Sequence, residues 1–122
     1  HMKSNQWGRI INITSEVFHK AAAPFSAYVA AKGAQVGWSR SMSQELAPFG
    51  VTVNMVAPGW VPVERHEKDP QEMKDGYFAT IPMKRWGKTE DIAHACCYFA
   101  CPEADFVTGQ TVAVNGGNSA WM

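Results

Sequence analysis

Three side chains in the first third of the chain have the types and spacing of an acid–base site, namely Ser15, Tyr28 and Lys32. Tyr28 and Lys32 are four residues apart, so on a helix they lie on the same face, one turn apart. Ser15 follows an apolar run, residues 8–14, that has the composition of a buried strand. A hydroxyl at the carboxyl end of a strand, facing a Tyr–Lys pair on the next helix, could form an acid–base site.

The elements around these residues alternate between strands and helices. Three apolar runs have the composition of strands, at residues 8–14, 51–56 and 111–115. Helices are predicted over residues 26–47, 70–80 and 90–100. The expected N-caps are Ser26, Asp69 and Thr89. Residues 15–24 are expected to form a loop. This order predicts an α/β fold with a parallel sheet and crossover helices, although three strands supply only half of a doubly wound sheet.

The composition limits both the size of the fold and its partners. The 122 residues suit one small domain, and 46% of them are hydrophobic, enough to bury a core. The formal net charge at pH 7 is zero, so we expect neither nucleic acid nor a membrane surface as a partner. No apolar run approaches the roughly 20 residues of a membrane span, and the start has no apolar signal-peptide segment.

The three cysteines, Cys96, Cys97 and Cys101, lie close together in one helical segment of the chain. An odd, clustered set is not typical of a secreted disulfide framework, which favours a reducing cytoplasm. Cys97 and Cys101 share a helical face, but no further cysteine stands nearby to complete a ligand set. We therefore expect buried thiols and no metal.

Five stretches of the chain form a longer pattern. They are GRIINITS ending at Ser15; YVAAK from Tyr28 to Lys32; VTVN followed by Ala57-Pro58-Gly59; Arg85-Trp86-Gly87 with Glu90-Asp91-Ile92-Ala93; and TGQ with the later NGG, from Thr108 to Gly117. In this order they resemble the C-terminal half of the short-chain dehydrogenase/reductases. One Y-x-x-x-K motif is a weak indication, whereas five ordered motifs over nearly the whole chain are a strong one. The pattern is most similar to 3-oxoacyl-carrier-protein reductases and sugar dehydrogenases.

The resemblance implies an NAD(P)-dependent oxidoreductase that interconverts a small-molecule carbonyl and a secondary alcohol. Tyr28 would donate the proton, aided by the charge of Lys32 and the positive end of its helix, and Ser15 would hold the carbonyl oxygen. The residues implied at the cofactor are Tyr28, Lys32, Pro58, Gly59 and Val61. The resemblance also implies a homo-oligomer, with residues 60–81 covering the substrate.

The part of the family pattern that cradles the dinucleotide does not occur in this sequence. The G-x-x-x-G-x-G turn, the residue that selects NAD or NADP, and the N-A-G segment are all missing. Val63 also stands where the family often has a threonine near the cofactor. We therefore expect residues 1–122 to form one partial domain, the C-terminal half of a Rossmann-like doubly wound sheet without its N-terminal dinucleotide-binding half. Alone, it should bind the dinucleotide weakly or not at all.

Two other functions fit the same residues. The chain could be an oligomeric structural or interaction module, because a half sheet exposes a strand edge that invites pairing. It could also be a hydrolase with Ser15 as the nucleophile and Tyr28 and Lys32 as the base. A hydrolase needs no dinucleotide, but the sequence offers no recognisable oxyanion hole.

Overall fold

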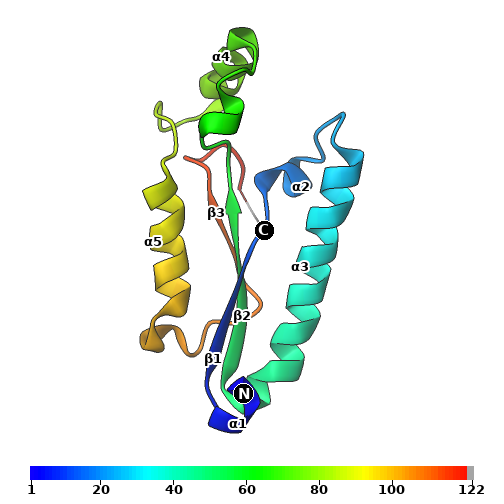
Figure 1. The fold of residues 1–122 in the computed structure, drawn as a ribbon, viewed down its shortest axis with the longest axis vertical. Helices are drawn as coiled ribbons and strands as arrows, with labels where there is room; N and C mark the ends of the chain where they lie inside the picture. Colours follow the sequence, from blue (N-terminus) through cyan, green and yellow to red (C-terminus); the bar gives the residue numbers. More distant parts are fainter. Residues whose placement is uncertain (121–122) are drawn as a thin grey trace.

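A computed structural model describes residues 1–120 and shows an α/β fold built on a three-stranded parallel sheet (Figure 1). Its strands are β1 (Gly8–Ile13), β2 (Val51–Pro58) and β3 (Thr111–Val114), in the spatial order β1–β2–β3. Gly8 pairs with Val51 in one ladder, and Met55 pairs with Thr111 in the other. The predicted half of a Rossmann-like parallel sheet, with about three strands, is confirmed.

Two helices cover the two faces of this sheet, and a third stands beyond its carboxyl edge. The helices are α1 (Met2–Asn5), α2 (Glu16–Lys20), α3 (Ser26–Leu46), α4 (Gln71–Thr80) and α5 (Thr89–Ala100). Figure 1 shows α3 and α5 on opposite sides of the strands. α3 packs on β2, and α5 packs on all three strands. α4 lies past the end of β2, and α2 also lies near the carboxyl edge of the sheet.

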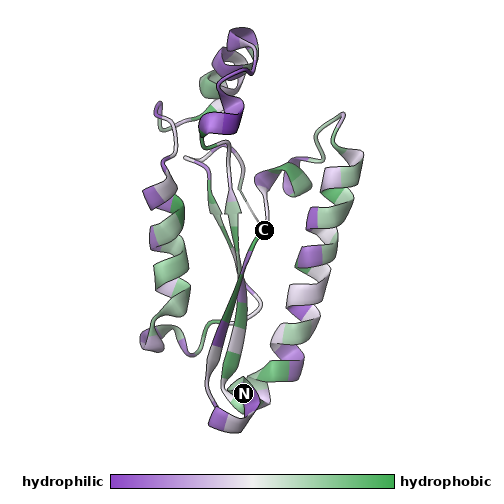
Figure 2. Cartoon of the chain, in the orientation of Figure 1, coloured by the Kyte–Doolittle hydropathy of each residue, from purple (hydrophilic) through white to green (hydrophobic). Residues whose placement is uncertain are grey.

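The central strand β2 forms the core because helices cover both of its faces. Its first seven residues are all buried. The fully buried apolar side chains include Val53, Met55 and Val56 of β2 and Phe99 of α5. Figure 2 shows hydrophobic residues along β2 and a hydrophilic start to α4. A strand buried on both faces reads as a continuous apolar run, which is why the sequence predicted β2 correctly.

The structure corrects the prediction of a simple loop at residues 15–24. Ser15 caps a short helix, α2, whose single turn leaves little periodic pattern to detect. The expected N-caps are also displaced by one residue. Ser26 and Thr89 are the first helical residues, with Phe25 and Lys88 as N-caps.

The third predicted N-cap, Asp69, is also wrong. The N-cap of α4 is Pro70, and no side chain caps this helix. The helices at residues 26–47, 70–80 and 90–100 were therefore located correctly, whereas their capping contacts were not. A single polar residue near a helix start identifies the terminus but does not fix which backbone amide it reaches.

The cysteines differ from expectation in their exposure. Cys97 is exposed, and Cys96 and Cys101 are partly buried; all three are free thiols. The prediction of buried thiols is wrong because Phe99 takes the sheet-facing side of α5. Within residues 1–120, no helix combines the length and apolar character needed to cross a bilayer.

Candidate active site

Ser15 lies two residues beyond the end of β1 and begins α2. Its backbone is extended, and its Oγ accepts a hydrogen bond from the Val17 amide at 3.2 Å, which caps the helix. The residue is buried. A serine hydroxyl that accepts one hydrogen bond still has its own proton to donate. Ser15 is therefore still able to bind a carbonyl oxygen.

Tyr28 and Lys32 meet on one face of α3, as their spacing predicts. Nζ of Lys32 lies 5.7 Å from the centroid of the Tyr28 ring. The same Nζ donates to the Ile13 carbonyl oxygen at 2.9 Å and to Gln35 Oε1 at 3.1 Å. Because Ile13 is the last residue of β1, Lys32 ties α3 to the strand that leads into Ser15. The Tyr28 side chain is 42% exposed.

The serine helix α2 is held against α3 by a close side-chain contact. A Cβ on Gly33 would lie 2.9 Å from Cε2 of Phe18, so the phenyl ring occupies the space that a side chain at position 33 would fill. The structure thus brings Tyr28 and Lys32 into contact and places Ser15 on the adjacent helix. Among residues 1–120, no hydrogen bond joins Ser15 Oγ to either of them.

The turn after β2 is shaped by close approach of the backbone to its neighbours. The Gly59 amide donates to the Val114 carbonyl at 2.9 Å, which joins the ends of β2 and β3. A Cβ on Gly59 would lie 2.7 Å from the Tyr77 hydroxyl and 2.9 Å from Asn115 Cβ. This position therefore requires glycine on steric grounds, before any ligand is considered.

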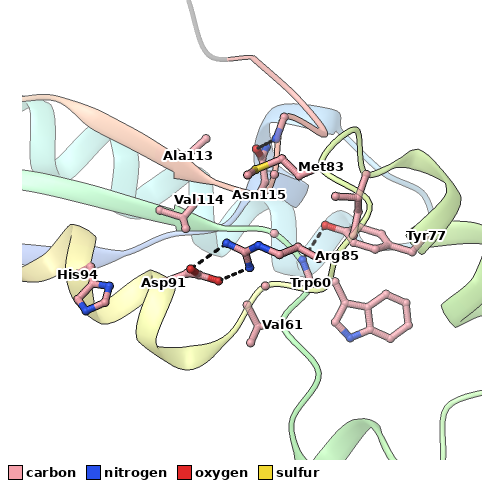
Figure 3. Close-up of a pocket in the computed structure, with 15 residues that line it drawn as sticks. Trp60, Val61, Tyr77, Met83, Arg85, Asp91, His94, Ala113, Val114 and Asn115 are labelled. Carbon is pink, nitrogen blue, oxygen red and sulfur yellow. Dashed lines mark hydrogen bonds and ion pairs between the residues drawn. The ribbon is translucent and has the colours of Figure 1, made fainter.

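A cavity of about 380 Å³ opens beside this turn (Figure 3). Val61 lines it, together with residues from α4, α5 and the end of β3. Arg85 and Asp91 form a two-pronged ion pair in its wall, with Arg85 Nη1 2.7 Å from Asp91 Oδ2 and Nη2 3.1 Å from Oδ1. The Arg85 guanidinium, followed by the Lys88 backbone amide, lowers the pKa of Asp91 to about 2. The pair joins the segment before α5 to the start of that helix.

Aromatic rings cluster around Trp60, which lies beside this cavity and beside a second one of about 640 Å³. The centroid of the Trp60 ring lies 5.3 Å from that of Tyr77, 5.8 Å from that of Trp86 and 5.6 Å from that of His66. Each pair makes an edge contact. Trp60 lines both cavities. Its indole N–H is buried and has no hydrogen-bond partner among residues 1–120.

The sequence reasoning missed Glu16, the most completely buried carboxylate beside the candidate site. Its side chain is only 2% exposed, and it accepts hydrogen bonds from the Tyr77 hydroxyl, Asn115 and Asn118. Burial, followed by the hydrogen bond to Glu16, raises the pKa of Tyr77 to about 12. The one available indication was a carboxylate immediately after Ser15, but its partners are 61 to 102 residues away.

The residues present fit the nicotinamide end of a dinucleotide better than its other end. Lys32 has three N–H donors and uses two, so one remains for a ribose hydroxyl beside Tyr28. A pyrophosphate needs a glycine-rich turn at a helix N-terminus. Residues 21–24, which precede α3, contain no glycine, and no side chain caps that helix.

Comparison with known proteins agrees with this partial site. A family model described as enoyl-(acyl carrier protein) reductase matches residues 1–119. The 3-oxoacyl-(acyl-carrier-protein) reductases of Rickettsia conorii and Haemophilus influenzae are 39% and 40% identical to the chain over 116 residues. Nodulation protein G of Rhizobium sp. (strain N33) is 41% identical over 116 residues.

Each alignment covers 95% of this chain but only 47% or 48% of the relative. The chain therefore spans about half the length of the curated relatives it matches. The match to the family model covers almost all of the chain, and the parallel sheet has the form expected from the ordered motifs. The chain belongs to the short-chain dehydrogenase/reductase family and corresponds to the half of its fold that follows the dinucleotide-binding half.

Proposed function

We propose that this chain is the acid–base half of an NAD(P)-dependent oxidoreductase that interconverts a carbonyl and a secondary alcohol. The observation that carries the proposal is the contact between Lys32 and Tyr28 at the end of β1, next to the helix that Ser15 caps. In open α/β sheets, ligands bind at the carboxyl ends of the strands, which is where these residues lie.

In this proposal Tyr28 gives its phenolic proton to the oxygen of a carbonyl substrate and takes it back in the reverse direction. Its ring is exposed, so a substrate can reach the hydroxyl. The ammonium of Lys32, 5.7 Å from the ring centroid, stabilises negative charge left on the phenol oxygen. Lys32 is held for this task by its hydrogen bond to Ile13.

Ser15 binds the same substrate oxygen with its hydroxyl proton while the Val17 amide fixes its Oγ. Its burial removes competing water and strengthens that hydrogen bond. Nicotinamide, when bound, supplies or accepts the hydride, which none of these side chains can do. The residues proposed to hold the nicotinamide and its ribose are Tyr28, Lys32, Pro58, Gly59 and Val61.

The substrate is proposed to be a small molecule that reaches into the space around Trp60. The indole N–H there is a buried donor without a partner among residues 1–120, and the surrounding rings favour an apolar group. Relatives named as 3-oxoacyl-(acyl-carrier-protein) reductases support a 3-oxoacyl group as the first substrate class to test.

The proposal includes a cytoplasmic homo-oligomer. Within residues 1–120, β1 and β3 each pair with β2 on one side and have no strand on the other. Such edges favour pairing with further strands. A hydrolase is less well supported, because a serine nucleophile needs a base within hydrogen-bond reach and Ser15 Oγ is bonded to a backbone amide instead.

Two measurements test the proposal. Fluorescence titration of the chain alone with NADH and NADPH should show weak binding or none. Pairing the chain with a dinucleotide-binding half should give turnover, and Tyr28→Phe should reduce that turnover by about 10²- to 10⁴-fold. Tyr98→Phe, which changes another exposed tyrosine, is the matched control. Equal rates for the two variants would refute the role of Tyr28.

A further inference from the structure

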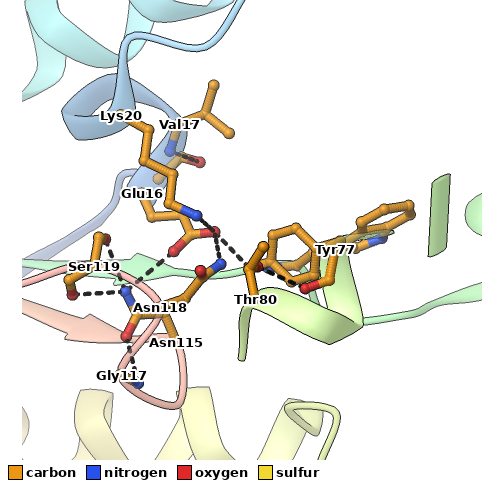
Figure 4. Close-up of polar contacts among 11 residues, drawn as sticks. Glu16, Val17, Lys20, Tyr77, Thr80, Asn115, Gly117, Asn118 and Ser119 are labelled. Carbon is orange, nitrogen blue, oxygen red and sulfur yellow. Dashed lines mark hydrogen bonds and ion pairs between the residues drawn. The ribbon is translucent and has the colours of Figure 1, made fainter. Parts of the chain in front are cut away.

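Glu16 is a buried carboxylate that contacts segments following all three strands (Figure 4). It comes directly after Ser15 at the end of β1. Its Oε1 accepts from the Tyr77 hydroxyl of α4 and from Asn118 Nδ2 at 3.3 Å. Its Oε2 accepts from Asn115 Nδ2 at 3.1 Å, immediately after β3.

The segment that follows β2 joins the same network through Tyr77. The Tyr77 hydroxyl donates to Glu16 and accepts a hydrogen bond from the Trp60 backbone amide at 2.7 Å. Trp60 follows the Gly59 turn at the end of β2. One phenol therefore connects α4, the turn after β2 and the Glu16 carboxylate, and the absence of a side chain at Gly59 leaves room for it.

The charge of Glu16 is compensated within the network. Lys20, one turn further along α2, places its Nζ 3.5 Å from Glu16 Oε1 and 5.4 Å from the centroid of the Tyr77 ring. A carboxylate that is 2% exposed needs such partners, because burying an unpaired charge is strongly unfavourable. The arrangement is therefore specific: removal of the carboxylate takes the acceptor from the Tyr77 hydroxyl and from Asn118, whereas Asn115 keeps its hydrogen bonds to Ser119.

We propose that Glu16 is a positioning residue, which fixes α4 and the turns after β2 and β3 against the loop that carries Ser15. The role rests on the proposed oxidoreductase function, in which Ser15 binds substrate and Trp60 lines its pocket. Glu16 acts through these residues and touches neither the reacting oxygen nor the proton donor.

Hydrogen exchange of the chain tests the network without any activity measurement. Glu16→Gln replaces one acceptor oxygen with an amide group, and Tyr77→Phe removes the hydroxyl but keeps the ring. Either variant loses a charge-assisted hydrogen bond, so exchange in residues 59–80 and 111–119 should become about 10- to 100-fold faster. The increase should be smaller in residues 51–57.

The control is Glu103→Gln, which removes an exposed carboxylate from η3 (Pro102–Ala104) before β3. Exchange in residues 59–80 that matches this control would overturn the proposal. A uniform rise that includes residues 51–57 would also overturn it, since that result indicates general stabilisation. If Glu16→Gln does not fold, Tyr77→Phe gives the same answer.

Two further readouts separate positioning from a purely structural role. The ζ-carbon NMR signal of Tyr77 should shift in Glu16→Gln, while those of Tyr28 and Tyr98 stay in place. In the form paired with a dinucleotide-binding half, Glu16→Gln should raise KM by about tenfold with a smaller change in kcat, because the pocket loosens while Tyr28 is untouched. An unshifted Tyr77 signal, or a loss confined to kcat, contradicts the proposal. Failure of the oxidoreductase function itself would appear separately, as a Tyr28→Phe variant with unchanged turnover.

Discussion

The two sides of the candidate site differ in how their side chains are held. On the α3 side, Tyr28 is exposed and Lys32 is fixed by two hydrogen bonds, one of them to the end of β1. On the α4 side, Glu16 is buried and receives hydrogen bonds from Tyr77, Asn115 and Asn118. Ser15 stands between the two sides, capping α2.

This difference follows from what each side is proposed to do. Proton transfer requires a side chain that a substrate can reach, so the hydroxyl of Tyr28 has to stay accessible. Shaping a pocket requires segments that do not move, and a satisfied buried network supplies that rigidity. Substitutions on the α3 side should therefore affect turnover more than stability, and those on the α4 side should affect stability more.

The largest effect is expected for Lys32→Met in the form paired with a dinucleotide-binding half. Turnover should fall by about 10²- to 10⁴-fold, because the phenol loses its neighbouring cation. The free energy of unfolding should fall by only about 0.5–1.5 kcal/mol for each of the two hydrogen bonds that Lys32 donates. Steady-state rates and urea denaturation measure the two quantities.

Lys84→Met is the matched control, since Lys84 Nζ also donates to a backbone carbonyl, that of Ala79, at 3.1 Å. It should reproduce the small loss of stability and leave turnover unchanged. If Lys32→Met also leaves turnover unchanged, the proposed difference between the α3 side and the α4 side is wrong.

The next largest effect is a loss of stability expected for substitution of Gly59, in the turn after β2. Gly59→Ala should destabilise the chain by about 1–3 kcal/mol, because the new Cβ meets the Tyr77 hydroxyl and Asn115. Gly76→Ala, in the interior of α4, meets nothing within 4 Å and should instead stabilise by about 0.5–1 kcal/mol. Thermal denaturation of both variants gives the comparison, and equal shifts in Tm would contradict it.

A smaller change in the free energy of unfolding is expected at alkaline pH. The pKa of Tyr77 is raised in the fold from its ordinary 10.0 to about 12, so the folded state holds this proton more tightly than the unfolded one. Its stabilising contribution is full below pH 10 and is lost as the pH rises toward 12. Tyr77→Phe should lack this part of the pH dependence, as seen by subtracting its stability curve from that of the wild type. Parallel curves for the two proteins would refute it.

The smallest effect on stability is expected at acidic pH, from the ion pair between Arg85 and Asp91 in the cavity wall. Asp91 has a folded pKa of about 2 against an ordinary value of 3.8, so its contribution is present above pH 3.8 and is lost as the pH falls through 2. The difference in stability between wild type and Asp91→Asn should therefore shrink between these two pH values. A difference that stays constant down to pH 2 would show that Arg85 does not favour the carboxylate.

The family, the three parallel strands and the shared helical face of Tyr28 and Lys32 were all predictable from the sequence. These features depend on short-range pattern: apolar runs for buried strands, a four-residue spacing for one helical face, and ordered motifs. The proposed roles of Ser15, Tyr28 and Lys32 in catalysis, and of Pro58, Gly59 and Val61 at the cofactor, remain predictions for the experiments above.

The burial of Glu16 was not predictable from the sequence, because its partners Tyr77, Asn115 and Asn118 are distant along the chain. Nothing in the spacing of positions 16, 77, 115 and 118 relates them, because they meet only when parallel strands bring their carboxyl ends to one edge. Carboxylates are seldom fully buried unless they are paired, and the sequence does not show which residues pair with Glu16. Glu16 is buried because Asn115 and Asn118 after β3 donate to it, and Tyr77 links it to the turn after β2.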